Sequence, residues 1–301
     1  MSLMTHDRHG MVLTTAFVAL WAAEEALTSL LMGRYGLDQI VWMRFAWHVL
    51  LLWIVFGRRE PQLLWRTQRP FFQLARAAMM VGMPACWVMG LHRGLSPSML
   101  MSVFWVAPLM ILALARLFLG ERASPTVWLA ALLACGGVFA LTGPHAVPSP
   151  LLLVFPLGMA LCFSAYVVMT RALRRERTRT NLFYTGLGVC LALAPLQPGG
   201  WVTPTPVDLT IAGGVALLGL GGLYALERLT AAAPVSRTAP LVYLQIPFAL
   251  GFAWMLELHH PSLRTLAIVA LTGAVVLYVW KRQRPFQRDS TLAADTGFGS
   301  L

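Results

Sequence analysis

The chain has 301 residues, of which 58% are hydrophobic and only 12% are charged. A soluble globular domain carries roughly 25% charged residues, so this composition excludes a soluble protein and indicates an integral membrane protein. The formal net charge of +11 would suggest a nucleic-acid partner in a soluble protein. Here the basic residues gather between apolar runs, and we expect no nucleic-acid partner.

Ten apolar runs are each close to the length of about 20 residues that spans a bilayer as a helix. Residues 268–277 are typical, because they are apolar at odd and even positions alike, whereas a membrane barrel requires strict alternation. We therefore predict an all-α integral membrane protein with ten transmembrane helices. The predicted spans are 11–32, 39–57, 71–92, 98–119, 126–142, 150–170, 181–197, 207–226, 235–256 and 263–281.

The basic residues between these spans predict the orientation of the chain. If the N-terminus is cytoplasmic, the inside segments hold seventeen Lys and Arg residues and the outside segments hold three. Cytoplasmic loops of membrane proteins carry an excess of Lys and Arg. This distribution predicts a multi-pass protein with both termini in the cytoplasm.

A spacing pattern occurs twice along the chain. Glu121, Pro125 and Gly137 are spaced like Glu257, Pro261 and Gly273, at an offset of 136 residues. The same offset places the first five runs approximately on the last five. An odd number of spans in a repeated unit inverts the second copy in the membrane, which is typical of transporters with alternating access around a midplane site.

These patterns predict the organisation of the chain as two inverted five-helix repeats with short flanking segments. The expected parts are a cytoplasmic N-terminus at 1–10, a first repeat at 11–142, an outer linker at 143–149, a second repeat at 150–281, and a cytoplasmic, disordered tail at 282–301.

Four short motifs carry a resemblance to a known family. They are Trp105-Val-Ala-Pro108-Leu109, Leu119-Gly-Glu121-Arg122, Gly136-Gly137 and Ala239-Pro240-Leu241-Val-Tyr243. With them, residues 11–281 resemble the drug/metabolite transporter superfamily, specifically its bacterial EamA-type ten-helix members. The stretch from Trp65 to Arg76 is most similar to the branch that includes S-adenosylmethionine and riboflavin carriers. The second loop reads Leu256-Glu257 where family members often carry Gly-Glu. The resemblance implies a transporter of the bacterial inner membrane and leaves its substrate open.

Two adjacent carboxylates, Glu24 and Glu25, lie inside the first apolar run. An ionisable group at bilayer depth costs about 2.5–3.5 kcal/mol on insertion scales and usually faces a cavity or a partner. Successive helix residues are about 100° apart, which puts Glu25 at the centre of a polar stripe with Trp21 and puts Glu24 at its edge. Burial and the neighbouring negative charge both favour a protonated carboxyl, so Glu25 is the first candidate for binding a cation or carrying a proton.

Further candidates come from depth, at about 1.5 Å of rise per helix residue. Arg44 and Trp105 fall near the layer of Glu25, His48 and Gln245 fall nearer the midplane, and Tyr243 and Arg76 fall toward the cytoplasm. The predicted substrate-binding residues are Glu25, Glu24, Trp21, Arg44, Arg76, Trp87, Trp105, Tyr243 and Gln245, and the predicted proton-coupling residues are Glu25 and His48.

Other interpretations of these residues remain open at this point. Glu24 or Glu25 could form a buried ion pair with Arg44 that only fixes helix packing, Arg44 could extend to the headgroups, and His48 could be an interhelical hydrogen-bonding residue. At the offset of 136 residues, Glu25 corresponds to Leu161. The charge is therefore present in one copy only, which favours a site for an asymmetric ligand.

The sequence thus predicts a secondary active transporter of a small polar, amine-bearing or zwitterionic metabolite, such as an amino acid or an S-adenosylmethionine-like compound. The alternatives are a broad exporter of aromatic or hydrophobic compounds and, less favoured, a membrane-embedded enzyme, since no HExxH or GxSxG motif occurs. The sequence also has no GxxxxGK[ST] motif, so we do not expect ATP to drive transport. We expect no cofactor and no metal, although His259-His260 is a weak metal-ligand pattern. The expected partners are the substrate and the lipid bilayer. Proton coupling or exchange, import or export, and a monomer or a homodimer all remain open.

Overall fold

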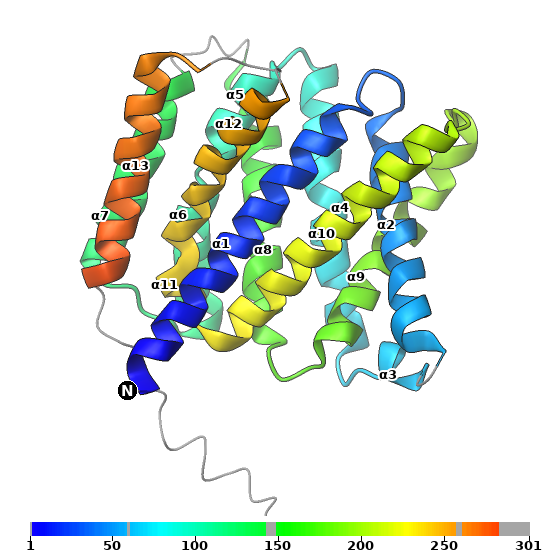
Figure 1. Cartoon of the computed structure of the whole chain (residues 1–301), viewed down its shortest axis with the longest axis horizontal. Coiled ribbons are helices and arrows are strands. Elements are labelled where there is room, and N and C mark those ends of the chain that lie inside the picture. Colours follow the sequence, from blue (N-terminus) through cyan, green and yellow to red (C-terminus); the bar gives the residue numbers. More distant parts are fainter. Residues whose placement is uncertain (1, 59–60, 143–148, 257–260, 283–301) are drawn as a thin grey trace, which may run out of the picture.

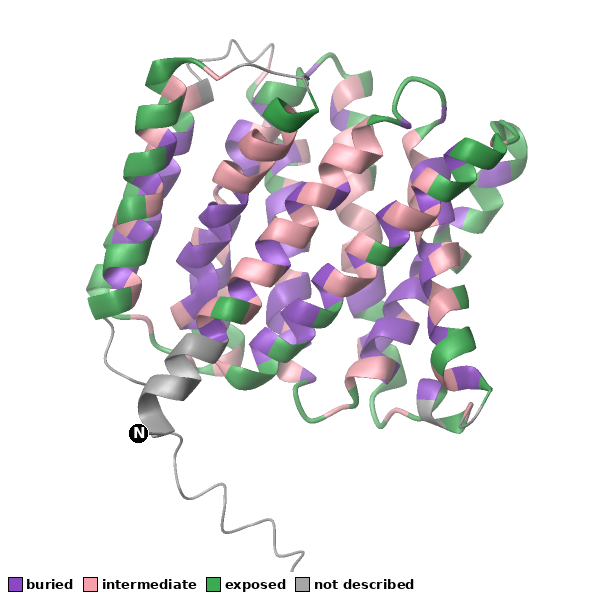
Figure 2. Ribbon diagram, in the orientation of Figure 1, coloured by how far each residue is buried: buried purple, intermediate pink, exposed green. Residues whose placement is uncertain are grey.

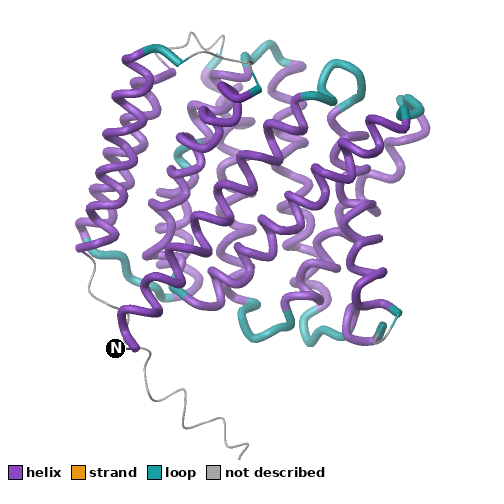
Figure 3. The backbone as a smooth tube through the Cα atoms, viewed as in Figure 1, coloured by secondary structure: helices purple, strands orange, loops and turns teal. Residues whose placement is uncertain are grey.

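A computed structural model of the chain describes residues 2–58, 61–142, 149–256 and 261–282. Within these ranges the chain is helical and contains no strand (Figure 3), which confirms the prediction of an all-α fold. Glu257, the pair His259-His260, most of the predicted linker and nearly all of the predicted tail lie outside the described residues.

Nine helical stretches within the described ranges are long and apolar enough to cross a membrane. A tenth apolar helix, α7 (Pro125–Thr142), is shorter and coincides with the predicted fifth span, so the count of ten spans stays a prediction. A short helix, α3 (Gln62–Trp65), follows the second stretch. The nine long stretches are α1 (Ser2–Ser29); α2 (Leu37–Leu52) with η1 (Trp53–Gly57); α4 (Pro70–His92); α5 (Pro97–Phe104) with α6 (Ala107–Leu119); η2 (Pro150–Leu153) with α8 (Val154–Ala172); α9 (Thr178–Leu193) with η3 (Ala194–Gly199); α10 (Pro206–Ala232); α11 (Val235–Thr238) with η4 (Ala239–Leu244) and α12 (Gln245–Met255); and α13 (Leu263–Arg282).

The N-terminus and the last turn of α13 lie at the same end of the helix bundle, which we call the terminal end (Figure 1). Buried residues gather in the central helices, whereas α7 and α13 form one edge and are exposed along their outer faces (Figure 2). Phe71 and Leu263 are each 85% exposed. Large apolar side chains on the outside of a helical bundle are expected where lipid is the solvent.

Two helices, α1 and α8, each pack closely on two others. Helix α1 packs on α10 and α12, and α8 packs on α4 and α6. Small residues let α4 and α8 approach each other closely. A Cβ at Gly82 would lie 2.6 Å from the Cys162 sulfur, and a Cβ at Gly158 would lie 2.9 Å from the Cys86 sulfur. Such small-residue contacts are the usual way in which helices associate in a bilayer.

Two of the long stretches are interrupted near their middle. Helix α5 ends at Phe104 and α6 begins at Ala107, and the 3-10 segment η4 separates α11 from α12. Pro108 and Pro240 stand next to these breaks, and proline lacks the N–H that continues a helix. The Tyr243 hydroxyl donates a hydrogen bond of 2.8 Å to the carbonyl of Trp105, so the two breaks are fastened to each other.

The turn after α1 is fastened to the start of α10. Arg34 pairs with Asp208 at 2.6 Å, and the Tyr35 hydroxyl donates to the other carboxylate oxygen at 2.7 Å. The Thr205 hydroxyl caps α10 by accepting from the Asp208 backbone N–H. The hydrogen bond to Asp208 raises the pKa of Tyr35, so the hydroxyl remains a donor at neutral pH.

We predict that Tyr35→Phe lowers the melting temperature of the protein in detergent, because the variant loses the hydroxyl that donates to the Asp208 carboxylate. Thermal unfolding of the purified protein measures this change. Tyr224→Phe is the matched control, because Tyr224 is 51% exposed on α10, the helix that Tyr35 contacts. Equal melting temperatures for the two variants would contradict the role of Tyr35.

Candidate functional site

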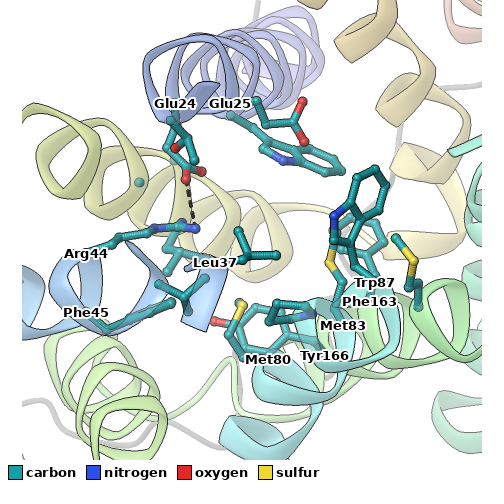
Figure 4. Close-up of a pocket in the computed structure, with 18 of the residues that line it drawn as sticks. Glu24, Glu25, Leu37, Arg44, Phe45, Met80, Met83, Trp87, Phe163 and Tyr166 are labelled. Carbon is teal, nitrogen blue, oxygen red and sulfur yellow. Dashed lines mark ion pairs between the residues drawn. The ribbon is translucent and has the colours of Figure 1, made fainter. Parts of the chain in front are cut away.

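A cavity of about 390 Å³ lies among the central helices. Its walls come from α1, α2, α4, α5, α8 and α10, and Figure 4 shows the side chains that surround it. The cavity reaches Met32 and Leu37, on either side of the turn between α1 and α2. This turn lies at the end of the bundle opposite the terminal end (Figure 1), so the cavity extends toward that opposite end.

The charged part of the cavity consists of Glu24 and Glu25 from α1 and Arg44 from α2. Arg44 Nη1 lies 2.9 Å from Glu24 Oε1, and the two side chains are 18% and 8% exposed. The sequence left open whether Arg44 pairs with Glu24 or with Glu25, and in the structure Arg44 pairs with Glu24. Because a buried charge needs compensation, Glu24 and Arg44 largely satisfy each other.

Glu25 is in a different situation. Its Oε2 accepts a hydrogen bond of 2.6 Å from the side-chain amide of Gln245, and the Trp21 side chain also hydrogen bonds with it. Both of these partners are neutral. The hydrogen bonds to Glu25 therefore come from neutral groups, while Arg44 forms its ion pair with Glu24 and acts on Glu25 only through its charge.

The remaining wall of the cavity is aromatic and rich in thioethers. The Trp21 ring stacks on Phe163 with 5.1 Å between centroids, and Trp87 and Tyr166 are among the other aromatic residues of the lining. Five methionines add flexible sulfur-containing side chains, which adapt to ligands of different shape. They are Met32, Met80, Met83, Met101 and Met159.

Arg76, a predicted substrate-binding residue, does not line the cavity. It is fully buried and pairs with Glu227 of α10, and it also donates to the Asn181 carbonyl and to the Thr170 hydroxyl. Asn181 in turn donates to Glu227 at 2.8 Å. We call Gln73, Arg76, Thr170, Asn181 and Glu227 the Arg76 network.

The Arg76 network lies directly behind one wall of the cavity. The Arg76 guanidinium is 5.2 Å from the centre of the Tyr166 ring, and Leu226, next to Glu227, also lines the cavity. Helix α10 begins at Pro206 beside the α1–α2 turn and runs toward the terminal end of the bundle (Figure 1). Leu226 and Glu227 therefore lie in the part of α10 that is nearer the terminal end. The network therefore separates the cavity from the terminal end.

Four other predicted site residues also lie outside the cavity lining. Trp105 and Tyr243 form a second aromatic layer, since the Trp105 ring is 6.3 Å from Trp21 and 5.8 Å from Tyr243. Gln245 contacts the site through Glu25. His48 is fully buried one turn beyond Arg44 and stacks on Phe45 at 5.6 Å.

Several contributors to the site were not predicted from the sequence, including Phe163 and Tyr166 of the cavity wall, Glu227 and Gly219. Glu227 falls one residue beyond the predicted span 207–226, whereas α10 continues to Ala232. A buried arginine in a membrane requires an acidic partner, and this requirement could have identified Glu227. Gly219 was also not predicted. Its lack of a side chain makes room for Arg44, because a Cβ at this position would lie 2.6 Å from Arg44 Nε. The described residues contain no group of three or more His, Cys, Asp or Glu side chains that could hold a metal ion.

Comparisons with known proteins agree with this architecture. Residues 8–143 match the model of the EamA-like transporter family. The S-adenosylmethionine uptake transporter of Rickettsia bellii is 24% identical over 85% of this chain and 86% of its own length, and that of Rickettsia conorii is 23% identical over 87% and 90%. Protein RarD of Salmonella typhi is 28% identical over 56% of this chain and 57% of its own.

A solved structure, titled only as a crystal structure of a protein, shares the fold. Its TM-score is 0.77 at 16% identity, over 91% of this chain and 99% of that one. The family match and the relatives confirm the resemblance and point to a transporter rather than an enzyme. Residues 8–143 are thus an EamA-family domain of the drug/metabolite transporter superfamily, in a multi-pass membrane protein.

Proposed function

We propose that this protein is a secondary active transporter of a small, amine-bearing or zwitterionic metabolite, and that it works by alternating access in the bacterial inner membrane. The observation that carries the proposal is Glu25, a carboxylate on a cavity wall whose hydrogen-bond partners Gln245 and Trp21 are neutral. Such a group attracts either a proton or the cationic group of a ligand. The names of the Rickettsia relatives support a substrate like S-adenosylmethionine, which carries a sulfonium, an amine and a carboxylate.

The cavity offers complementary groups for such a ligand. Glu25 would take the cationic group, and Trp21, Trp87 and Phe163 would stack on a planar or cationic part. Arg44 has five N–H donors, and Glu24 engages its Nη1, so other donors can meet a ligand carboxylate. In this account Trp105, Tyr243 and Gln245 hold the first layer of side chains in place from behind.

The arrangement of the cavity supports alternating access. The cavity reaches the end opposite the termini at Met32, and the Arg76 network separates it from the terminal end. With both termini in the cytoplasm, this is an outward-directed form whose inner side is held closed by the pair of Arg76 and Glu227. In this account Arg76 closes the inner path rather than contacting the ligand.

The helix pairings support the proposed inverted repeats. If the first five spans correspond to the second five, α1 corresponds to α8, α10 to α4, and α12 to α6. The contacts of α1 with α10 and α12 then correspond to the contacts of α8 with α4 and α6. The two interrupted spans also occupy corresponding places, as α5–α6 and α11–α12.

A second candidate function is the export of hydrophobic or aromatic compounds. The five methionines and the aromatic wall favour it, because such surfaces accept apolar ligands of varied shape. The two functions differ in their dependence on charge. A transporter of cationic metabolites requires Glu25, whereas an exporter of neutral aromatic compounds does not.

We predict that Glu25→Gln weakens binding of a cationic substrate about 30-fold or more, as expected when one partner of a buried charge pair is removed. Thermal-shift titration of the purified protein with S-adenosylmethionine, amino acids, polyamines and riboflavin would first identify the ligand, since a ligand that prefers the folded state raises the melting temperature. Glu176→Gln is the control, because it makes the same change in charge in a loop between α8 and α9. Unchanged affinity and transport in Glu25→Gln would contradict the proposed site.

We predict that Gly219→Ala selectively weakens ligands that carry a carboxylate. The added Cβ would lie within 2.9 Å of three atoms of the Arg44 guanidinium and must displace it. The affinity for a carboxylate-bearing ligand should fall about tenfold, the value of one hydrogen bond to a charged group, and that for its decarboxylated amine should fall less. Gly213→Ala on the same helix is the control, since its Cβ would meet nothing within 4 Å. An equal loss for both ligands would contradict a role of Arg44 in carboxylate binding.

A further inference from the structure

Gln245 connects the cavity to the interruption in the α11–α12 span. It is the first residue of α12, directly after the 3-10 segment η4, and only 1% of it is exposed. Its side-chain amide donates across to Glu25 of α1 at 2.6 Å. One side-chain hydrogen bond therefore joins the cavity carboxylate to the residue at which this span changes its helical geometry.

The same interruption is fastened to the interruption of the α5–α6 span. Two residues before Gln245, the Tyr243 hydroxyl donates to the Trp105 carbonyl at 2.8 Å. The Trp105 ring lies 5.8 Å from the Tyr243 ring and 6.3 Å from Trp21 of the cavity wall. The contacts thus form a continuous path from Glu25 through Gln245 and Tyr243 to Trp105.

The strength of the first link depends on the charge of Glu25. A hydrogen bond to an ionised carboxylate is roughly twice as strong as one between neutral groups. The charged groups around Glu25 are Glu24 on the same helix and Arg44 on α2, and these two are paired with each other. A proton or a ligand cation on Glu25 therefore changes the strength of the hydrogen bond with Gln245.

We propose that Gln245 is a positioning residue that makes the movement of the α11–α12 span depend on the occupancy of Glu25. When the cavity is empty and Glu25 is ionised, the strong hydrogen bond from Gln245 holds the start of α12 against α1. When a cation or a proton neutralises Glu25, the bond weakens and the span is released to move at its interruption. This inference rests on the proposed function and adds the residue that links binding to the change of access.

The proposal predicts how exchange and net transport differ. A carrier that is held while empty exchanges ligand across the membrane but returns slowly without ligand, so exchange exceeds net efflux. Gln245→Leu removes the amide donor and should let the empty carrier return. The ratio of net efflux to exchange should then rise by about tenfold, the value of one hydrogen bond to a charged group.

The experiment uses the full chain in proteoliposomes loaded with labelled S-adenosylmethionine. Efflux is measured with and without unlabelled compound outside, for the wild type, Gln245→Leu and Gln197→Leu. Gln197 is the matched control, a buried glutamine whose amide donates to the Leu193 carbonyl away from the cavity. Its ratio should equal that of the wild type, because a merely structural loss lowers both rates together.

If Gln245→Leu does not fold, Gln245→Met tests the same point, since methionine is unbranched, of similar length and without a donor. A ratio equal to the wild-type ratio in a folded Gln245 variant would overturn the inference, while the proposed function would stand if Glu25→Gln still weakened binding of the cationic substrate. If the wild-type protein bound and moved no S-adenosylmethionine, amino acid or polyamine, both the proposed function and this inference would fail.

Discussion

The structure depends on how charges are compensated at bilayer depth, where an unpaired ionised group costs several kcal/mol. Arg76 and Glu227 compensate each other, and so do Arg44 and Glu24. Glu25 is the exception among these charged groups, because its hydrogen-bond partners are an amide and an indole. The two ion pairs stabilise the arrangement of the helices, and Glu25 is the group that we propose binds a ligand cation or a proton.

Helix α10 combines these interactions along its length. Asp208 near its start binds the turn after α1, Glu227 near its end binds Arg76 of α4, and Gly219 between them makes room for Arg44 of α2. The helix therefore contacts the cavity in its middle and is held by an ion pair toward each end. Any change of access that moves α10 relative to α4 must break the buried pair of Arg76 and Glu227, which makes this pair a natural barrier between two states.

The two carboxylates of α1 have different environments, although they are adjacent in sequence. Glu24 points to α2 and meets Arg44, whereas Glu25 meets Gln245 from α12. A rotation of about 100° between successive residues is enough to direct neighbours toward different helices. This geometry lets one carboxylate serve the packing of α1 against α2 while the other remains available to a ligand.

The composition and the apolar runs predicted the all-helical membrane fold, because lipid imposes the length and apolarity of a spanning helix directly on the sequence. Helical phase and depth likewise brought Glu24, Glu25, Trp21 and Arg44 together, and all four line the cavity. Phase placed Glu24 at the edge of the polar stripe, but the cavity is wider than one stripe and includes it. The proximity of these four residues could be predicted because it depends only on the local geometry of one or two helices.

The Arg76 network could not be predicted in this way. Arg76 and Glu227 are 151 residues apart in sequence, and their contact depends on which helices become neighbours, which hydropathy does not encode. The predicted end of the eighth span at residue 226 also left Glu227 outside the membrane. Gln245 was predicted as a direct ligand contact from its depth, whereas its partner is Glu25. Depth specifies the layer of a side chain but not the direction in which it points.

The central claim is that Glu25 binds the cationic group of the substrate. An experimental structure of the protein with its bound ligand, identified by thermal shift, tests this claim most directly. The account predicts the cationic atom within about 4 Å of the Glu25 carboxylate, the usual limit of an ion pair, with the pair of Glu24 and Arg44 still in place. A ligand whose cationic group contacts Glu24 instead, or that binds outside this cavity, would contradict the account.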